Sequence, residues 1–418
     1  MGIKVLHFVP QWPDKEEDAT LFDLYLNKIG EEAEVCAATL SPVKEQSRGA
    51  YQRCCIGSGK ADYGKHGMVN LLALQKRFLQ LLYQLMPQVV HIHGSYYFLN
   101  SRIALWSRKR GFPVVFSPYG GMNPDFVDQE YGMRTWKLLS YQKKMVRNAS
   151  CTLISDAKEG EYIKNEKLSE RIAFIHDPRS EEATNLDDYA DCTLQVYQKV
   201  LDTDMGRHID RQSQEAVSAL LHLCMAGENE RQPLCPEDIL NLRSITPKKW
   251  RDIYLYAAEQ GVTAYINDGI ARAQLAVPEN EAAGINHFPL RYPKDTSPLP
   301  GDKLLVKNVL SRKALERKLT HTRGAERTLC IMLHNLHHHV KESTLSLRHL
   351  CDIYEMLRHT PFDEDKLAEH LSEQRIHTFT RRICQVLEEV AYLDLGFMPV
   401  AALNDKGTEK IRANLIKY

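Results

Sequence analysis

Two histidines spaced two residues apart close a short apolar run in the first half of the chain. His91 and His93 end the sequence VVHIH, directly before Gly94. Alternate side chains of a strand point to the same side, so the two imidazoles would share one face of a sheet. The carboxyl end of a strand is where open α/β sheets bind ligands, and imidazole can orient or accept a proton near neutral pH. His93 is therefore the first candidate catalytic residue, with core packing as the alternative for either histidine.

Other loops carry residues that could bind a sugar or a phosphate. Tyr119, Gly120 and Gly121 follow a second apolar run, and glycines permit a ligand to approach the backbone closely. Ser95 follows the first histidine pair, two residues after its end. Trp12 lies in the loop after the first apolar run, where its ring could stack on a sugar.

A histidine-rich stretch in the second half offers a different chemistry. His334 and His338 are four residues apart, which places them one turn apart on a helix and could bind a transition metal. His349 and Asp352 are possible further ligands. A solvated histidine-rich helix face is the alternative interpretation.

The elements that must position these residues follow two different patterns. In the first part, apolar runs rich in β-branched residues alternate with helical patterns, which predicts a Rossmann-like, doubly wound parallel sheet. Beyond residue 178 such runs nearly disappear and helical spacing dominates, which predicts a mainly α-helical region. The predicted strands cover residues 3–9, 35–39, 89–93, 114–117, 151–154 and 172–175. The predicted helices cover residues 68–86, 101–110, 135–146, 213–224, 250–259, 327–340, 345–358, 365–373 and 378–393.

This change of pattern gives a domain division. We expect residues 1–178 to form the Rossmann-like domain and residues 179–418 to form the helical region. The proline-rich interval 277–301 is expected to be a loop that divides the helical region into two lobes, or that leaves one lobe with a long excursion.

Composition and charge exclude several classes of protein. The 418 residues carry 54 basic and 54 acidic side chains, so a uniformly basic nucleic-acid-binding protein is excluded. The ten cysteines show no C-x-x-C spacing, the start of the chain does not resemble a secretory signal, and a cytoplasmic location is expected. Basic residues at 108–110 and between 137 and 147 are consistent with peripheral contact at the inner face of the plasma membrane. The sequence indicates no cofactor, and it does not indicate the oligomeric state.

Four stretches carry a family resemblance, at residues 4–10, 87–94, 111–122 and 141–149. In order and spacing they resemble the N-terminal, acceptor-side domain of family-four-like glycosyltransferases of the GT-B class, which serve bacterial surface polysaccharide synthesis. The resemblance spans residues 3 to about 176. It implies an enzyme that moves a sugar from a nucleotide-sugar to a saccharide or lipid-linked acceptor, with the donor held by a second Rossmann domain. It also implies a site at His93, lined by Ser95, Tyr119, Gly120 and Gly121.

The sequence departs from the family pattern at three places. Residues 17–20 read EDAT where the family often has a glycine pair, and Tyr119 stands where it commonly has a histidine. From residue 151 onward no glutamate has another glutamate eight positions later, although that pair holds the donor in the family. The alternative is therefore a degenerate, non-catalytic relative that acts as a binding, scaffold or regulatory protein.

Overall fold

The computed structural model describes residues 2–13, 15–41, 47–57, 70–129, 135–136, 138–176, 185–226, 234–278, 287–291 and 293–415. The chain forms two compact units. The N-terminal unit comprises Met1–Thr203 together with Asn286–Pro289, and the C-terminal unit comprises Asp204–Ile285 and Leu290–Tyr418. Among the described residues, no helix combines the length and apolar character needed to cross a bilayer.

The N-terminal unit is built on one sheet, whose described strands run in the order β3-β4-β2-β1-β5-β6-β7-β8. All neighbouring strands pair in parallel except the short β3, which is antiparallel to β4. The Rossmann-like, doubly wound sheet expected from the apolar runs is confirmed. The strands are β1 (Lys4–Val9), β2 (Glu34–Thr39), β3 (Ser47–Arg48), β4 (Tyr51–Cys55), β5 (Val89–His93), β6 (Val114–Ser117), β7 (Cys151–Ile154) and β8 (Ile172–Phe174).

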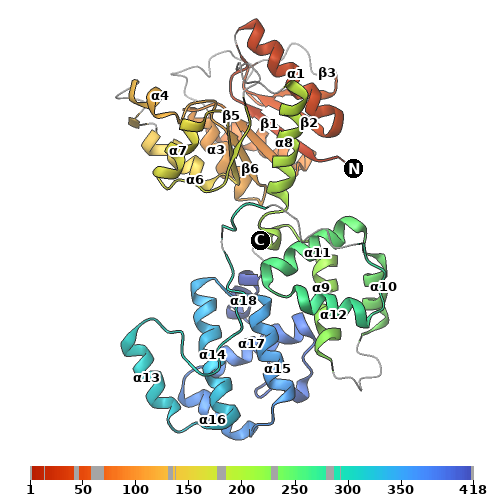
Figure 1. The fold of residues 1–418 in the computed structure, drawn as a ribbon, viewed down its shortest axis with the longest axis vertical. Coiled ribbons are helices and arrows are strands. Elements are labelled where there is room, and N and C mark those ends of the chain that lie inside the picture. The colour runs from red at the N-terminus through yellow and green to blue at the C-terminus, as the bar shows by residue number, and fades with distance from the viewer. Residues whose placement is uncertain are drawn as a thin grey trace. The chain divides into compact units, whose positions relative to one another are not determined.

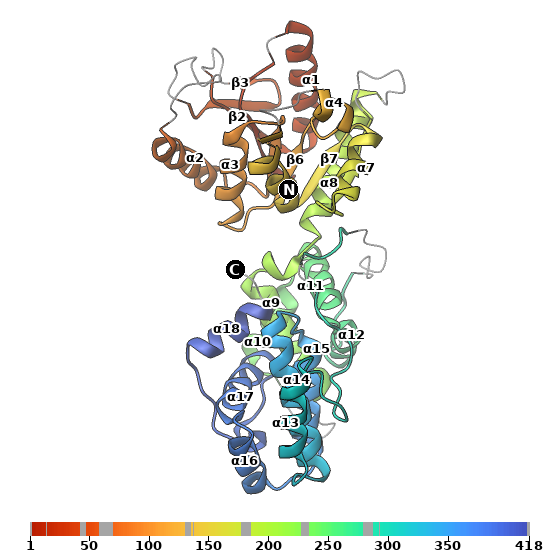
Figure 2. The ribbon, with the colours of Figure 1, turned by 90° about the vertical axis from the view of Figure 1, so that its left-hand side faces the viewer.

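Helices cover both faces of this sheet. Leu6, Phe8 and other side chains on one face form a core with α2, α3, α6 and α7, and α2 lies beside α3 (Figure 2). Val5 and other side chains on the opposite face pack against α1 and α8. The helices of this unit are α1 (Glu16–Glu32), α2 (Leu71–Leu85), α3 (Phe98–Arg108), α4 (Pro124–Gln129), the π-helical turn η1 (Leu138–Gln142), α6 (Lys143–Asn148), α7 (Ala157–Asn165) and α8 (Leu186–Leu201).

Because it includes helix α8, the N-terminal unit ends later in the sequence than residue 178, the predicted boundary. The side chain of Asn185 caps the helix by accepting a hydrogen bond from the Asp188 N–H at 2.8 Å. Tyr197 and Val200 of α8 are buried in the same core as α1, and the two helices lie side by side (Figure 1). The unit therefore extends through Thr203 instead of ending at residue 178, because an apolar face of α8 covers the sheet.

The C-terminal unit consists of helices around one core. Apolar residues before and after the interval 277–301, such as Leu220 and Leu350, belong to one continuous cluster, which favours one lobe with a long excursion over two lobes. No strand occurs among the residues that the structure describes after Phe174. The elements are η2 (Met205–Arg207), α9 (Arg211–Met225), α10 (Pro236–Ser244), α11 (Pro247–Gln260), α12 (Thr263–Arg272), α13 (Val309–Leu319), α14 (Gly324–Glu342), α15 (Leu347–His359), α16 (Glu364–Glu373), α17 (His377–Ala391), η4 (Leu395–Phe397) and α18 (Lys406–Leu415).

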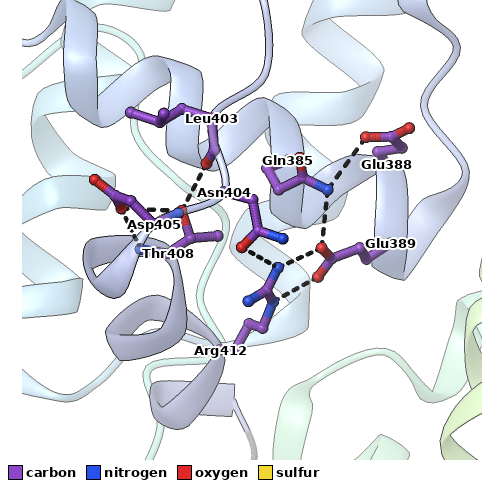
Figure 3. Close-up of polar contacts among 8 residues, drawn as sticks. All are labelled: Gln385, Glu388, Glu389, Leu403, Asn404, Asp405, Thr408 and Arg412. Atoms are coloured by element: carbon purple, nitrogen blue, oxygen red, sulfur yellow. Dashed lines mark hydrogen bonds and ion pairs between the residues drawn. The ribbon is translucent and has the colours of Figure 1, made fainter.

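Ion pairs and a capping residue fix the last helix on α17 (Figure 3). Arg412 of α18 makes a two-point ion pair with Glu389 of α17, and it also donates to the Asn404 side chain. Asp405 accepts hydrogen bonds from the N–H groups of Gly407 and Thr408 at the start of α18. The end of the described chain is thereby attached to the core of the C-terminal unit.

Candidate functional site

The carboxyl ends of three neighbouring strands bring the candidate residues together. β5 lies between β1 and β6, with His7 opposite His91 and His93 opposite Ser117. Because these side chains are on the sheet face covered by α1 and α8, the histidines of β1 and β5 meet beneath those helices. The expectation that His91 and His93 share one side of the sheet is confirmed, since their ring centroids are 4.1 Å apart.

The histidines form a buried cluster with a direct contact between two imidazoles. Nδ1 of His7 lies 2.9 Å from Nε2 of His93, a hydrogen-bond distance, and the two rings are stacked. His7, His91 and His93 expose 0, 1 and 3% of their surface. A ligand therefore cannot touch these imidazoles without displacing the groups that cover them.

Burial determines the charge of this cluster. Removal from water disfavours the imidazolium form, which lowers the pKa of His7 to about 3. Burial, reinforced by repulsion from the neighbouring histidines, also holds the pKa of His91 and of His93 well below its usual value. All three side chains are neutral at physiological pH, so His93 is a weak general base and is better suited to orienting a neighbour.

The ring nitrogens that take no part in the contact between His7 and His93 lie within hydrogen-bond distance of hydroxyl groups. Nδ1 and Nε2 of His91 lie 2.6 Å from the Tyr197 hydroxyl and 2.7 Å from the Ser117 hydroxyl. Nδ1 of His93 lies 2.7 Å from the Tyr119 hydroxyl, and Nε2 of His7 lies 3.4 Å from that of Tyr197. Each ring nitrogen of the cluster therefore has a hydrogen-bonding partner.

Tyr119 is the member of this network that reaches the surface. The residue is 42% exposed, while its hydroxyl bonds to a histidine that is 3% exposed. Its backbone adopts a φ of +50°, and the following Gly120 has a φ of +76°. Such left-handed conformations are uncommon for tyrosine and are retained where the surroundings impose them, often at functional sites. Tyr119 can thus contact a ligand at the surface and a buried histidine at the same time.

The glycine loop after β6 is closed by a carboxylate of the protein itself. Glu159, at the start of α7, is fully buried and accepts hydrogen bonds from the N–H groups of Met122 at 2.8 Å and Gly120 at 3.4 Å. Burial outweighs these donors and raises the pKa of Glu159 to about 7. The N–H group of Gly121 bonds to the carbonyl of Pro118. A phosphate could reach the N–H groups of Gly120 and Met122 only by displacing Glu159.

The remaining candidates lie in packed positions of the same unit. The Ser95 hydroxyl donates to the carbonyl of Pro118 at 2.7 Å, and a side chain at Gly121 would collide with it. The half-buried Trp12 ring stacks under the guanidinium of Arg53, 3.5 Å from its carbon, and packs edge-on against Phe22. Ser95 thus shapes the loop after β6, and a sugar could stack on Trp12 only through the ring face that Arg53 leaves open.

The histidine cluster of the sheet does not fit a metal ion. His7, His91 and His93 bring ligand atoms within 4.8 Å of one another, but each ring nitrogen is already hydrogen-bonded. No carboxylate among the described residues contributes to their pKa shifts. A divalent ion here would be a buried charge without an anionic ligand, which is strongly unfavourable.

The predicted metal-binding pair, His334 and His338, lies on α14 but does not form a group with metal-binding spacing among the described residues. Among the described residues, the second group with metal-binding spacing is Asp295, His339 and His349, and it contains neither His334 nor His338. Nε2 of His334 instead lies 3.0 Å from the side-chain oxygen of Gln374.

The group of Asp295, His339 and His349 is also committed to protein contacts. Nδ1 of His339 bonds to the Thr344 hydroxyl at 2.9 Å, and Asp295 accepts from the Ser297 N–H at 2.9 Å. Asp352, the other possible ligand, accepts from the N–H of Leu299. These contacts support a structural role for the histidines of the C-terminal unit.

Three residues of the site were not predicted from the sequence. His7 is in the first apolar run, and the parallel pairing of β1 with β5 would have placed it beside His91. Tyr197 lies on a helix that the sequence assigns to the other region, and Glu159 follows β7 without a motif. A histidine inside an otherwise apolar strand was the one available signal.

Comparisons with known proteins do not identify a family for this chain. No protein-family model matches the chain, and no curated protein matches it. The UDP-N-acetylglucosamine 2-epimerase from Rickettsia bellii is a similar solved structure, with 9% identity, a TM-score of 0.32 and coverage of 60% of this chain and 67% of that one. A chain from Listeria monocytogenes, also named as a UDP-N-acetylglucosamine 2-epimerase, has 11% identity, a TM-score of 0.29 and coverage of 59% and 66%. TM-scores this low do not establish a shared fold, so the Rossmann-like assignment rests on the strand order and parallel pairing.

Proposed function

We propose that the chain is a glycosyltransferase-related protein that moves a sugar from a nucleotide-sugar to a saccharide or lipid-linked acceptor in bacterial surface polysaccharide synthesis. The observation that carries the proposal is the hydrogen bond between the half-exposed Tyr119 and the buried His93, at the carboxyl edge of the sheet. The proposal places the reaction in the cytoplasm, at or near the inner face of the plasma membrane.

In this proposal the loops after β5 and β6 bind the acceptor. Tyr119 makes the direct contact with a sugar oxygen, and His93 holds the tyrosine in place from beneath. Fixing an acceptor in one orientation lowers the entropic part of the transfer barrier. Because His93 is buried and neutral, it acts through Tyr119.

A matched set of variants tests this assignment. Purified protein is assayed for nucleoside-diphosphate binding by calorimetry and for nucleotide-sugar hydrolysis and transfer. His93→Ala and Tyr119→Phe are expected to lose turnover at least tenfold, whereas Tyr83→Phe, which alters an exposed tyrosine of α2, is expected to keep it. Full turnover in His93→Ala would refute the role of this histidine.

Two structural observations favour a second candidate, a non-catalytic binding or scaffold protein. The described residues contain one sheet, so no second Rossmann-like sheet is present among them to hold a nucleotide-sugar. The glycine-loop N–H groups also bind Glu159. Saccharide binding that weakens in Tyr119→Phe, without binding of any nucleotide, would support this candidate and exclude the transferase.

A further inference from the structure

Helix α13 and the segments that flank it carry a strong positive charge. Residues 303–323 contain seven basic side chains and one acidic side chain, in a chain whose formal net charge is zero. Arg312 is partly buried, and the other six cations are exposed, namely Lys303, Lys307, Lys313, Arg317, Lys318 and Arg323. An uneven distribution of this kind produces a local positive field that the net charge of the chain does not reveal.

Most of these cations are not used in strong contacts within the protein. Lys318 donates to the carbonyl of Glu373 at 3.0 Å. The ion pairs of Lys307 and Arg312 are long, at 3.8 and 3.9 Å. Within the part of the chain that the structure describes, no ion pair or hydrogen bond uses four further side chains, those of Lys303, Lys313, Arg317 and Arg323. The positive charge is therefore available to a partner at the surface.

The outward face of α13 combines these cations with apolar side chains. Leu319 is the buried residue of the helix, and it lies nine residues after Leu310, which places the two on opposite faces. Leu310 and its neighbour Val309 are 81 and 51% exposed. Lys313 and Arg317 follow Leu310 by three and seven residues, so they share its face. Large apolar and cationic side chains thus lie side by side in solvent.

Contacts at both ends fix α13 on the C-terminal unit. The fully buried Asn335 of α14 donates to the carbonyls of Pro300 and Lys303, each at 2.8 Å. Its side-chain oxygen accepts from the N–H of Leu305, also at 2.8 Å. At the other end of α13, Leu319 belongs to the apolar core. A helix of 11 residues is marginal alone in water, so these contacts maintain it and present its outward face.

Both views place α13 at the outside of this unit. Figure 1 shows the helix at one side of the unit, and Figure 2, viewed from that side, shows it in front of α14. Its outward face is therefore open to a broad, flat partner.

This combination of side chains fits an anionic phospholipid surface. Lys and Arg side chains are attracted to anionic headgroups, and an exposed leucine beside them can enter the boundary between headgroups and acyl chains. The sequence of α13 contains no aromatic side chain on which a nucleic-acid base could stack. Among polyanions, a lipid surface is the one that also accommodates Leu310 and Val309.

We propose that α13 docks the protein on an anionic phospholipid membrane, with Leu310 and Val309 in the interface and Lys313 and Arg317 against the headgroups. The inference rests on the proposed function only for the choice of membrane, the inner face of the plasma membrane. It also changes the expected place of contact, because the basic residues at 108–110 and between 137 and 147 belong to the N-terminal unit.

Flotation of the full-length protein with lipid vesicles tests the proposal. The wild type is expected to bind vesicles of phosphatidylcholine and phosphatidylglycerol in equal parts, but not vesicles of phosphatidylcholine alone, and added salt should weaken the binding. Lys313→Gln with Arg317→Gln is expected to lower the affinity about 25-fold, since each cation near the surface contributes about fivefold. Wild-type protein that does not bind the mixed vesicles, or unchanged affinity in this variant, would overturn the proposal.

Two matched double variants show whether the position of the cations matters. Arg243→Gln with Lys248→Gln removes two exposed cations elsewhere in the C-terminal unit, and Lys144→Gln with Arg147→Gln removes two from the N-terminal unit. Both are expected to keep the wild-type affinity. A larger loss in either one than in the α13 variant would place the membrane contact elsewhere.

Leu310→Ser separates a lipid surface from other polyanions. This variant keeps every charge and is expected to lose at least about threefold in affinity for the mixed vesicles, because the leucine enters the interface. Unchanged affinity would contradict the docking geometry. Binding of the wild type to heparin without binding to the mixed vesicles would indicate a soluble polyanion as the partner and would overturn the membrane assignment.

The substituted side chains are all exposed, so the variants are expected to fold, and circular dichroism checks this. Vesicle binding requires neither nucleotide nor acceptor. Binding without any turnover would mean that the docking surface holds and the transferase function fails. Turnover on a soluble saccharide without vesicle binding would mean the reverse.

Discussion

Both faces of the sheet have an apolar core, and the face covered by α1 and α8 also buries the histidine cluster. On the face covered by α2 and α3, Leu6, Ile92 and Phe116 point into an apolar core, and all three are fully buried. On the face covered by α1 and α8, the adjacent strand positions are His7 and His91, which are as deeply buried. Burial alone therefore does not distinguish structural from functional positions; the need for partners does, because a buried polar group is stable only when it is hydrogen-bonded.

This contrast assigns different tasks to the two faces. The apolar face gains free energy from area removed from water and requires no specific geometry beyond close packing. The histidine cluster on the other face depends on hydrogen bonds, at distances of 2.6 to 2.9 Å for most of the network, and it ends at the exposed Tyr119. This cluster is thus the part of the sheet that can transmit a change at the surface to the interior.

The largest expected difference between the faces is in acid. The pKa of His7 is about 3 in the folded protein and near 6.5 in the unfolded chain, so only the unfolded state takes up a proton between these values. Stability is therefore complete above pH 6.5 and falls as the pH decreases toward 3, by up to about 5 kcal/mol for this histidine. Urea unfolding at a series of pH values measures it, in a Trp250→Phe background that leaves tryptophan reporters only in the N-terminal unit.

Matched variants isolate the contribution of His7. His7→Phe is expected to reduce the pH dependence without abolishing it, because the pKa of His91 and of His93 is lowered as well. His176→Gln, at a partly exposed histidine of the same unit, is expected to leave it unchanged. Equal slopes for the wild type and His7→Phe would show that His7 is not the group responsible.

A cavity on the apolar face is expected to have the next largest effect. Phe116→Ala should lower the free energy of unfolding by about 3–5 kcal/mol at neutral pH, since the side chain is fully buried. Phe116→Leu, which removes less volume, should cost less. The pH dependence of unfolding should stay unchanged in both variants, and a changed slope would show that the faces are not independent.

Removal of the Ser117 hydroxyl is expected to have a smaller effect on the free energy of unfolding. Ser117→Ala leaves Nε2 of the buried His91 without its 2.7 Å partner, which should cost about 1–3 kcal/mol. The comparison is Ser107→Ala on α3, where the lost bond runs to the carbonyl of Ile103, which remains a helix acceptor. Equal unfolding energies for Ser117→Ala and the wild type would remove Ser117 from the network.

The smallest effect is expected at the outer surface of the apolar side. Leu72 on α2 is 79% exposed, so Leu72→Ser should change the free energy of unfolding by less than about 0.5 kcal/mol. Denaturant unfolding at neutral pH checks this value. A loss above about 1 kcal/mol would mean that Leu72 is covered in solution.

The sequence predicted the position of several strands well, but it did not predict all the strands and helices of the N-terminal unit. The runs at residues 89–93, 114–117 and 151–154 became β5, β6 and β7 with the same bounds, because buried parallel strands read as continuous apolar runs. Strands β3 and β4 were missed, since the former is two residues long and the latter contains Gln52 and Arg53. The acidic stretch before α8 resembled a connector, and the helix itself was not recognised.

The site was predictable only where position along one strand was sufficient. His93 and Tyr119 were found because they follow strand ends, and the structure joins them by a hydrogen bond. His7 and Tyr197 are separated from their histidine partners by 86 to 190 residues, and no local pattern encodes such distances. Gly120 and Gly121 were predicted to bind a substrate. The sequence did not show that Glu159 accepts a hydrogen bond from the N–H group of Gly120.

The N-terminal unit is encoded by two separate stretches of sequence, with consequences for dividing the protein. Phe288 returns from the long excursion to the core beneath α8, where its N–H donates to the Thr203 hydroxyl at 3.0 Å. The neighbouring Pro289 accepts from the Arg171 guanidinium at 2.7 Å. A fragment that ends at residue 178 would lose α8 and expose an apolar sheet face, which invites aggregation. A fragment that ends at Thr203 would still lack Phe288, so limited proteolysis within the excursion should yield pieces that stay together until denaturant is added.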